Sequence, residues 1–412
     1  MKTALRLFLC GALIATALGS CVFTLPQQVQ VPAKSPVTIP ADVTGYGLIF
    51  LRARVNNSQP MWFALDSGAS FPLVIDDRRA RDLGLKLQDN STRESAGAGP
   101  DTYRVALTRD VSINLGDLKF TGQTAAVLAL GSLEALAGRP LDGLVGSDLF
   151  TRYVVEIDYS GNKITLSDPQ AYTYTGAGES LPLTLRDNHF FVPAKIEMPG
   201  RARLDGQFLV DTGGGLVTAV LTSPFAKSRN VPAPTQRTIL DRSLSGLGGE
   251  TRLLVSRATV LALGKLVIRE PVIYVSQDRG GALASSDYDG IIGSEILQKF
   301  KVIFDYARGR MILEPNAHYA EPLEYDMSGV RLRASGDDFR TFRVYQVLKD
   351  SPAAEAGLRQ GDVLTAIDDA SASGFSLDEI YQMLKQQGRE YKLSFQRGSE
   401  TLSVKIKLRR LI

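Results

Sequence analysis

Short apolar segments, broken by Gly, Pro, Asn and Asp, make up most of the chain between residues 45 and 316. Apolar and polar residues alternate over residues 47–65 on both sides of a polar turn, which predicts a β-hairpin. A short polar helix is expected over residues 76–85, and no other long helix is expected in this region. Short strands joined by Gly and Pro turns predict a mainly β fold.

Two parts of this region repeat one another. An Asp-(Ser/Thr)-Gly tripeptide, an apolar Asp-Gly segment and an Asp-Tyr segment follow in this order at 66–68, 141–149 and 155–159, and again at 211–213, 288–296 and 302–306. The offset is 145 residues for the first block and 147 for the other two. Three blocks at nearly constant offset indicate an internal duplication. Asp66 and Asp211 therefore occupy equivalent places in its two copies.

The two aspartates each follow an apolar run, where an ionised carboxylate is costly unless something holds it. Copies related by an approximate dyad bring equivalent positions face to face, so we expect Asp66 and Asp211 to meet. Two carboxyl groups in contact do not both ionise readily, and one keeps a proton. The ionised group can take a proton from water while the other donates one to a substrate carbonyl, which is general acid–base hydrolysis of an amide.

The sequence Phe-Ala-Leu-Asp-Ser-Gly-Ala-Ser at 63–70 resembles the active-site motif of retropepsin-like and pepsin-like aspartic proteases. Leu-Val-Gly at 144–146 and Ile-Ile-Gly at 291–293 resemble the second signature of that family. The resemblance implies two acid-protease β-barrel lobes related by a pseudo-dyad, over residues 45–168 and 181–316. It also implies an aspartic endopeptidase that acts on polypeptides and builds its active site within one monomer.

The same resemblance assigns roles to residues of both tripeptides. It makes Asp66 and Asp211 catalytic, and Ser67 and Thr212 would lock the two loops together by hydrogen bonds to backbone. Ser70 would supply an outer hydrogen bond to its aspartate. The residues expected to support the two aspartates are Ser67, Gly68, Ser70, Thr212 and Gly213.

The second motif departs from the family pattern at Gly214-Gly215, where Ala and then Ser or Thr are usual. This departure leaves open an alternative, a catalytically weak or inactive protease-like lipoprotein that binds peptides. A trypsin-like serine protease is disfavoured, because His189 and His318 both follow Ser67 and no Gly-x-Ser-x-Gly is present.

Glycine-rich segments occupy matching places in the two copies, at 94–100 and 244–250. Such segments suit hairpin tips that can move. By resemblance they are candidate flaps that close over a substrate, although two mobile surface loops would have the same composition. The candidate flap residues are Gly97, Gly99, Gly246 and Gly248.

The pattern changes after residue 326. A short capped helix at 350–358, a strand near 363–368, a helix over 376–387 with a capping box and a final alternating strand follow one another. This order resembles a PDZ domain of the bacterial periplasmic type, an α/β domain over 327–412. The resemblance implies that peptide termini bind here, with a packing-only domain as the alternative. The candidate carboxylate-binding loop is Ser328, Gly329, Val330, Arg331 and Leu332.

The N-terminus reads as an export signal. Two cations at positions 2 and 6 precede an apolar stretch over 7–18, which is too short to span a bilayer comfortably. The following Leu-Gly-Ser-Cys resembles a bacterial lipobox and would make Cys21 the lipidated first residue, although ordinary cleavage nearby would leave it incidental. We expect a signal peptide over 1–20 and a proline-containing tether over 21–44. Val22 after the cysteine implies delivery to the outer membrane, facing the periplasm of a Gram-negative bacterium.

Composition and charge argue against a nucleic-acid-binding protein and against a metal-binding protein. The net charge is +3, and charges of both signs are mixed along the chain, which argues against a nucleic-acid partner. Two histidines far apart and two cysteines do not form metal-binding spacings. The sequence therefore predicts neither a metal nor another cofactor.

Overall fold

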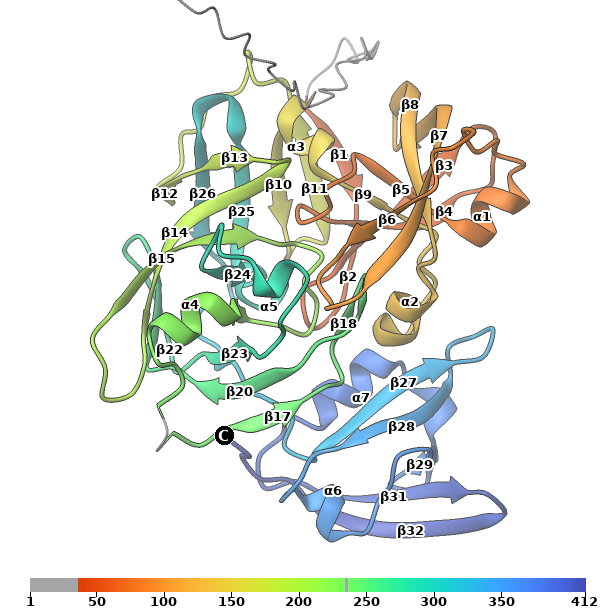
Figure 1. The fold of residues 1–412 in the computed structure, drawn as a ribbon, viewed down its shortest axis with the longest axis vertical. Coiled ribbons are helices and arrows are strands. Elements are labelled where there is room, and N and C mark those ends of the chain that lie inside the picture. Colours follow the sequence, from red (N-terminus) through yellow and green to blue (C-terminus); the bar gives the residue numbers. More distant parts are fainter. Residues whose placement is uncertain (1–35, 234–235) are drawn as a thin grey trace, which may run out of the picture.

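The computed structural model describes residues 36–233 and 236–412, and the protein is mainly β, as predicted. Two β lobes stand side by side around a shared sheet, and a third domain packs beneath both of them (Figure 1). Here lobe 1 means residues 42–152, lobe 2 means residues 184–292, and the C-terminal domain means residues 327–412.

Lobe 1 is a closed barrel. Its sheet runs in the order β2-β3-β4-β9-β5-β8-β7-β6, and an additional pairing of β3 with β7 closes the ring. The strands are β2 (Asp42–Val43), β3 (Ile49–Val55), β4 (Met61–Leu65), β5 (Leu73–Asp76), β6 (Arg93–Ala96), β7 (Thr102–Leu115), β8 (Leu118–Leu128) and β9 (Gly143–Val145).

Lobe 2 repeats the central topology of lobe 1. In lobe 1, β9 pairs parallel to β4 and antiparallel to β5, and β5 is parallel to β8. In lobe 2, β24 pairs parallel to β15 and antiparallel to β16, and β16 is parallel to β23. The strands are β13 (Thr184–Arg186), β14 (His189–Glu197), β15 (Leu204–Val210), β16 (Ala219–Leu221), β17 (Ile239–Asp241), β18 (Ser245–Gly246), β19 (Gly249–Glu250), β20 (Leu253–Arg257), β21 (Val260–Leu263), β22 (Leu266–Arg269), β23 (Val272–Ser276) and β24 (Gly290–Ile292).

A six-stranded sheet joins the lobes in the order β1-β11-β10-β25-β26-β12. At its centre the equivalent strands β10 and β25 pair antiparallel, so the duplication meets itself there. The strands are β1 (Val37–Pro40), β10 (Val154–Asp158), β11 (Lys163–Ser167), β12 (Glu179–Pro182), β25 (Phe300–Asp305) and β26 (Arg310–Pro315).

The expected tether over 21–44 includes described residues that are not a free linker. Strand β1 pairs with β11 and buries Ile39 in the main core, and β2 pairs with β3. The apolar side chain of Ile39 and a free sheet edge explain why this segment joins the fold.

Helices in this region are short. The expected helix over 76–85 is shorter in the structure, because Asp76 caps it from outside by accepting the Arg78 amide and Leu83 ends it. The helices are α1 (Asp77–Asp82), α2 (Gly131–Ala137), α3 (Ser147–Arg152), α4 (Ser223–Ser228), α5 (Ser294–Leu297), η1 (Ala282–Ala284) and η2 (Tyr306–Arg308).

The C-terminal domain has its own apolar core and a sheet in the order β27-β28-β29-β31-β32. Its expected helix over 376–387 ends early, at Met383, because the chain turns away so that the Leu384 carbonyl accepts the Met327 amide. The elements are β27 (Val330–Ser335), β28 (Thr341–Val347), α6 (Pro352–Glu355), β29 (Val363–Ile367), β30 (Ala370–Ser371), η3 (Ala372–Gly374), α7 (Leu377–Met383), β31 (Glu390–Arg397) and β32 (Glu400–Lys407).

The C-terminal domain is not an independent appendage. Leu348 and Leu411 belong to a buried apolar cluster whose other members include Val255 and Tyr274 of lobe 2. Polar contacts extend this contact to both lobes, since Asp378 of α7 accepts the Gly45 amide at 2.7 Å. Among the described residues, no helix has the length and apolar character needed to cross a membrane.

Candidate active site

Asp66 and Asp211 follow the equivalent strands β4 and β15 and are held there in the same way. The amide of Asp66 donates to the carbonyl of Val145, and the amide of Asp211 donates to the carbonyl of Ile292. Each acceptor belongs to the parallel neighbour strand, β9 or β24, which carries the apolar signature before its glycine. The second signature therefore fixes the position at which each active-site loop leaves its strand.

Four buried hydrogen bonds tie the two loops to each other. Thr212 Oγ1 accepts the Ser67 amide at 2.9 Å and donates to the Leu65 carbonyl at 2.8 Å. Ser67 Oγ accepts the Thr212 amide at 3.0 Å and donates to the Val210 carbonyl at 2.7 Å. Both hydroxyl side chains have no exposed surface. This is the arrangement that the resemblance implied for Ser67 and Thr212.

The two carboxyl groups lie across the dyad, each against the glycine of the opposite loop. Gly68 and Gly213 donate their amides to the aspartates of their own loops, at 2.8 and 2.9 Å. A Cβ on Gly213 would lie 2.7 Å from both oxygens of Asp66, and a Cβ on Gly68 would lie 2.7 Å from Asp211 Oδ1. Only glycine allows this approach, which brings the two carboxyl groups close enough for each to influence the ionisation of the other.

Burial makes the two carboxyl groups harder to ionise, but not equally. Burial and the nearby charge of Asp66 hold the pKa of Asp211 well above its usual range. Burial also raises the pKa of Asp66, but hydrogen bonds from Gly68 and Asp211 and the nearby His189 oppose the rise. Asp211 is therefore the partner that keeps the proton, and Asp66 is the partner that ionises.

A cavity of about 800 Å³ lies over the two carboxyl groups. Its walls come from both lobes and are mostly apolar, with Phe71 and Leu133 on one side and Phe191 and Ile291 on the other. An apolar cavity with a few convergent polar groups is the usual form of a substrate site.

The two candidate flaps meet over this cavity. The Gly99 amide donates to the Leu247 carbonyl at 3.0 Å, and the Asp101 amide donates to the Gly248 carbonyl at 2.8 Å. Gly97 and Gly246 line the cavity itself. The two segments are hairpin tips in the structure, one between β6 and β7 and the other between β18 and β19.

The outer parts of the two active-site loops differ from the expectation. Ser70 Oγ lies 3.2 Å from His189 Nε2 of lobe 2 instead of bonding the Asp66 carboxyl. At the equivalent Gly215, the Leu48 side chain fills the space, with Cγ 2.7 Å from where a Cβ would stand. His189 and Leu48 were not predicted as site residues, because both lie outside the repeated blocks.

The candidate carboxylate loop of the C-terminal domain has its donors already bonded. The Gly329 amide donates to Asp326 at 2.5 Å, and the Val330 amide donates to Ser328 Oγ at 3.0 Å. Both the amide and the carbonyl of Leu332 bond the Tyr381 hydroxyl of α7, at 3.0 Å each. In this conformation all three amides therefore bond side chains of the C-terminal segment itself, and none of them is free to bind a peptide.

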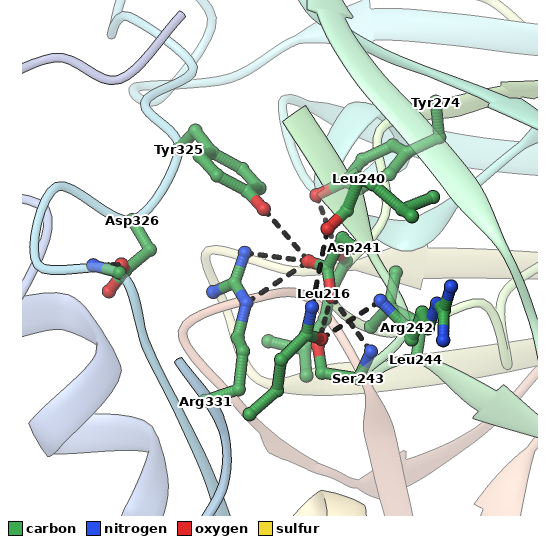
Figure 2. A network of polar contacts seen from close by, with 12 residues as sticks. Leu216, Leu240, Asp241, Arg242, Ser243, Leu244, Tyr274, Tyr325, Asp326 and Arg331 are labelled. Atoms are coloured by element: carbon green, nitrogen blue, oxygen red, sulfur yellow. Dashed lines mark hydrogen bonds and ion pairs between the residues drawn. The ribbon is translucent and has the colours of Figure 1, made fainter. Parts of the chain in front are cut away.

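Arg331, also in this loop, points away from the C-terminal domain into lobe 2 (Figure 2). Its Nε and terminal nitrogen donate to Asp241 Oδ2 at 3.0 and 2.8 Å. Tyr325 adds a bond to Asp241 Oδ2 at 2.8 Å, and the Ser243 amide and hydroxyl donate to the other carboxyl oxygen. Asp241 ends β17, four residues before β18, so this buried network connects the C-terminal domain to the second flap.

The network also decides the ionisation state of Asp241. Burial acts to raise the pKa of this carboxyl, and the Arg331 charge with the Ser243 and Tyr325 bonds outweighs burial, so the pKa lies below its usual range. Arg331 and Asp241 are therefore a buried, charged pair, with 8 % and 1 % of their surfaces exposed.

Two known domain families match the chain. Residues 51–149 match the family described as Aspartyl protease, and residues 343–397 match the family described as PDZ domain. The chain contains an aspartyl protease-like domain and a C-terminal PDZ domain. The first match covers most of lobe 1, and we refer to the C-terminal domain as the PDZ domain from here on.

Similar whole proteins share only parts of the chain. A probable CtpA-like serine protease of Staphylococcus haemolyticus (strain JCSC1435) is 27% identical over 135 residues, which are 32% of this chain and 25% of that protein. One of Staphylococcus aureus (strain COL) is 43% identical over 61 residues, which are 15% of this chain and 12% of that protein. The chain thus spans a quarter or less of the length of these relatives.

Two solved structures were also found to be similar. The aspartic proteinase from Irpex lacteus has a TM-score of 0.42 and 14% identity, over 70% of this chain and 99% of the other. Basic 7S globulin from soybean has a TM-score of 0.39 and 13% identity, over 70% of this chain and 97% of the other.

Proposed function

We propose that the protein is an aspartic endopeptidase that hydrolyses peptide bonds with Asp66 and Asp211. The observation that carries the proposal is the approach of these two partly buried carboxyl groups to the glycines of the opposite loops, beneath an apolar cavity of about 800 Å³. The unequal ionisation of the two groups gives each of them a role. No cluster of metal-ligating side chains occurs among residues 36–233 and 236–412.

In the proposed mechanism, the Asp66 carboxylate removes a proton from a water that attacks the peptide carbonyl, and the Asp211 carboxyl donates its proton to the carbonyl oxygen. The tetrahedral intermediate then breaks its C–N bond, and the proton held by Asp66 passes to the leaving nitrogen. The proton of the new carboxyl oxygen returns to Asp211. No covalent intermediate with the protein forms.

The alternative, a peptide-binding protein without activity, was motivated by Gly214-Gly215. The structure supplies a reason for the second glycine that does not involve loss of activity, because Leu48 occupies the space of its side chain. Both active-site loops also keep the same bonds to their aspartates. We therefore favour the enzyme.

The test is cleavage of a broad peptide library by the purified full-length chain between pH 3 and 7.5. We expect cleavage that pepstatin inhibits and that Asp66→Asn and Asp211→Asn each reduce by about 10³-fold or more. Asp205→Asn is the matched control, since Asp205 is an exposed carboxyl of lobe 2. Full activity in both active-site variants, or no cleavage at any pH, would overturn the proposal.

We further propose that the PDZ domain recruits or positions peptide termini at Ser328–Leu332. The Tyr381 hydroxyl bonds both the amide and the carbonyl of Leu332 in β27. A peptide that adds as a strand beside β27 needs these two backbone groups, so Tyr381 must first release them. Binding of labelled C-terminal peptides should therefore increase in Tyr381→Phe. Equal binding to a peptide with an amidated terminus would contradict carboxylate recognition.

The remaining proposal concerns location, and Cys21 lies outside the described residues. We propose that Cys21 is lipidated and anchors the protein at the outer membrane, facing the periplasm. Cys21→Ser should then move the protein from the membrane fraction to the soluble periplasmic fraction and abolish incorporation of labelled fatty acid. Unchanged fractionation would refute the anchor.

A further inference from the structure

His189 reaches from lobe 2 onto the active-site loop of lobe 1. It is the first residue of β14 and follows the two-residue turn Asp187-Asn188, in which both residues have positive φ, 49° and 63°. Such a turn matches the twist of the β13–β14 hairpin and fixes the direction in which His189 leaves it. His189 Nε2 lies 3.1 Å from the Gly68 carbonyl and 3.2 Å from Ser70 Oγ.

The hydrogen on this ring nitrogen follows from its partner. A carbonyl oxygen only accepts hydrogen bonds, so Nε2 must donate to Gly68. Asn188 adds a second contact, since its side-chain amide donates to the Ser70 carbonyl at 3.3 Å. The hairpin of lobe 2 thus holds the turn that follows Asp66 at two points.

The duplication identifies the counterpart of His189 in the other lobe. Phe191 of β14 pairs with the residue two before Asp211, and Phe50 of β3 pairs with the residue two before Asp66. The residues two positions before these phenylalanines are His189 and Leu48, which are therefore equivalent positions in the two lobes.

Leu48 makes the mirror contact on the other active-site loop. Its side chain packs on Gly215, and Gly215 and Ser70 each stand four residues after their aspartate. The pseudo-dyad therefore relates two crossing contacts of opposite character, a polar one from His189 to Ser70 and an apolar one from Leu48 to Gly215. The histidine in place of leucine and the serine in place of glycine therefore belong together, because each side chain of one lobe matches the residue that it contacts in the other.

The charges around His189 lie on several elements of the same cavity. Asp66 and Asp211 line this cavity from the two active-site loops, Arg186 and Asp187 belong to the hairpin of His189, and Asp287 precedes β24. Arg186 is turned aside, because it stacks on Phe191 and bonds the Asp287 carbonyl.

We propose that His189 is a positioning residue that makes the two carboxyl groups inequivalent, by holding the Gly68–Ser70 turn and placing a cationic imidazole beside Asp66 but not beside Asp211. An imidazole is positively charged at the acidic pH at which carboxyl groups titrate. It therefore favours the ionised form of Asp66, and its effect lowers the pKa of this carboxyl. Leu48, the counterpart of His189 on the other loop, carries no charge and gives Asp211 no such effect. The inference rests on the proposed function for its catalytic meaning.

Two variants of the full-length chain separate the hydrogen bond of His189 to the Gly68–Ser70 turn from the charge of its imidazole. His189→Leu copies the side chain of Leu48, and His189→Gln keeps a donor without the charge. For His189→Leu we expect kcat to fall about fivefold with KM changed less, and the acidic limb of the kcat/KM profile to move up by about one pH unit. His189→Gln should recover most of kcat and keep the shifted limb. His318→Leu, which removes the other, half-exposed histidine, should match wild type.

A second measurement does not depend on activity. A ¹³C NMR titration of the aspartate carboxyl groups should show the lower of the two apparent pKa values of the pair rising in both His189 variants and staying in place in His318→Leu. An unchanged titration, or wild-type kcat and pH limbs in both variants, would overturn this role of His189. If Asp66→Asn cleaves peptides as wild type does, the proposed function fails instead, and the titration alone decides the inference.

Discussion

The buried pair of Asp241 and Arg331 should hold the PDZ domain and the second flap together, and removing one partner should be costly. In Asp241→Asn, the guanidinium of Arg331, only 8 % exposed, loses the carboxylate that accepts two of its hydrogen bonds. Breaking a buried pair on one side costs about 3–5 kcal/mol. Asp326, a second buried carboxyl near Arg331, retains part of the attraction, so we expect about 3 kcal/mol.

Arg331→Met tests the same pair from the other side. It leaves Asp241 with its bonds from Ser243 and Tyr325, and we again expect a loss of about 3 kcal/mol. The double variant removes both buried charges and should lie within about 1 kcal/mol of either single variant. Because Asp241 is four residues before β18, the single variants should also speed hydrogen exchange at residues 245–250.

Urea unfolding of the full-length chain at pH 7 measures the first effect, and exchange followed by mass spectrometry measures the second. Because Arg331 and the hydrogen bonds lower the pKa of Asp241 against the effect of burial, its contribution is present above about pH 4 and disappears as the pH falls through the lowered value. Single variants within about 1 kcal/mol of wild type, or a double variant with the summed loss, would refute the reasoning.

Three further predictions concern the two active-site loops. Thr212→Val removes the acceptor of the buried Ser67 amide and should destabilise the protein by about 2–4 kcal/mol in urea unfolding, whereas a loss below about 1 kcal/mol would contradict a structural role. Because burial and Asp66 raise the pKa of Asp211, its contribution to stability falls as the pH rises above about 4, so Asp211→Asn should raise the melting temperature more at pH 7 than at pH 4, and an equal change at both would argue against a raised pKa. Gly213→Ala places a Cβ 2.7 Å from both carboxyl oxygens of Asp66 and should lower kcat about 100-fold with an unchanged far-UV CD spectrum, whereas near-wild-type kcat would contradict the close approach.

The mainly β fold could be predicted from the sequence, because short alternating strands and a duplicated set of motifs leave their mark on the residues themselves. The mutual approach of Asp66 and Asp211 followed from the repeat, since equivalent positions meet at a dyad. His189 and Leu48 left no such mark. They belong to hairpins that cross from one lobe to the other, and the residue types at these two places differ, so no repeat links them.

The PDZ loop shows a different limit of sequence reasoning. The order of helices, glycines and strands locates Ser328–Leu332, but two of the three groups that bond this loop are distant from it in the sequence. Asp326 accepts the Gly329 amide, Tyr381 takes the Leu332 backbone, and Asp241 lies in lobe 2. The Tyr381 contact depends on the folding of the PDZ domain itself, and the Asp241 contact depends on the packing of that domain on lobe 2, so no local pattern around Ser328–Leu332 encodes either of them.

The two flaps occupy equivalent places in the duplication, but they differ in their contacts with the PDZ domain. The second flap is fixed to the PDZ domain at both ends, through Arg333 bonds to Ser243 and Ser245 at its start and through a Tyr345 bond to Glu250 at its end. Among the described residues, the first flap, between β6 and β7, makes no hydrogen bond to the PDZ domain, and its tip bonds the second flap. Opening the cavity between the two tips requires that these bonds break. Because the second flap is held at both ends by Arg333 and Tyr345, we expect the first flap to open more readily. Removal of the Arg333 or Tyr345 contacts should make opening of the second flap easier.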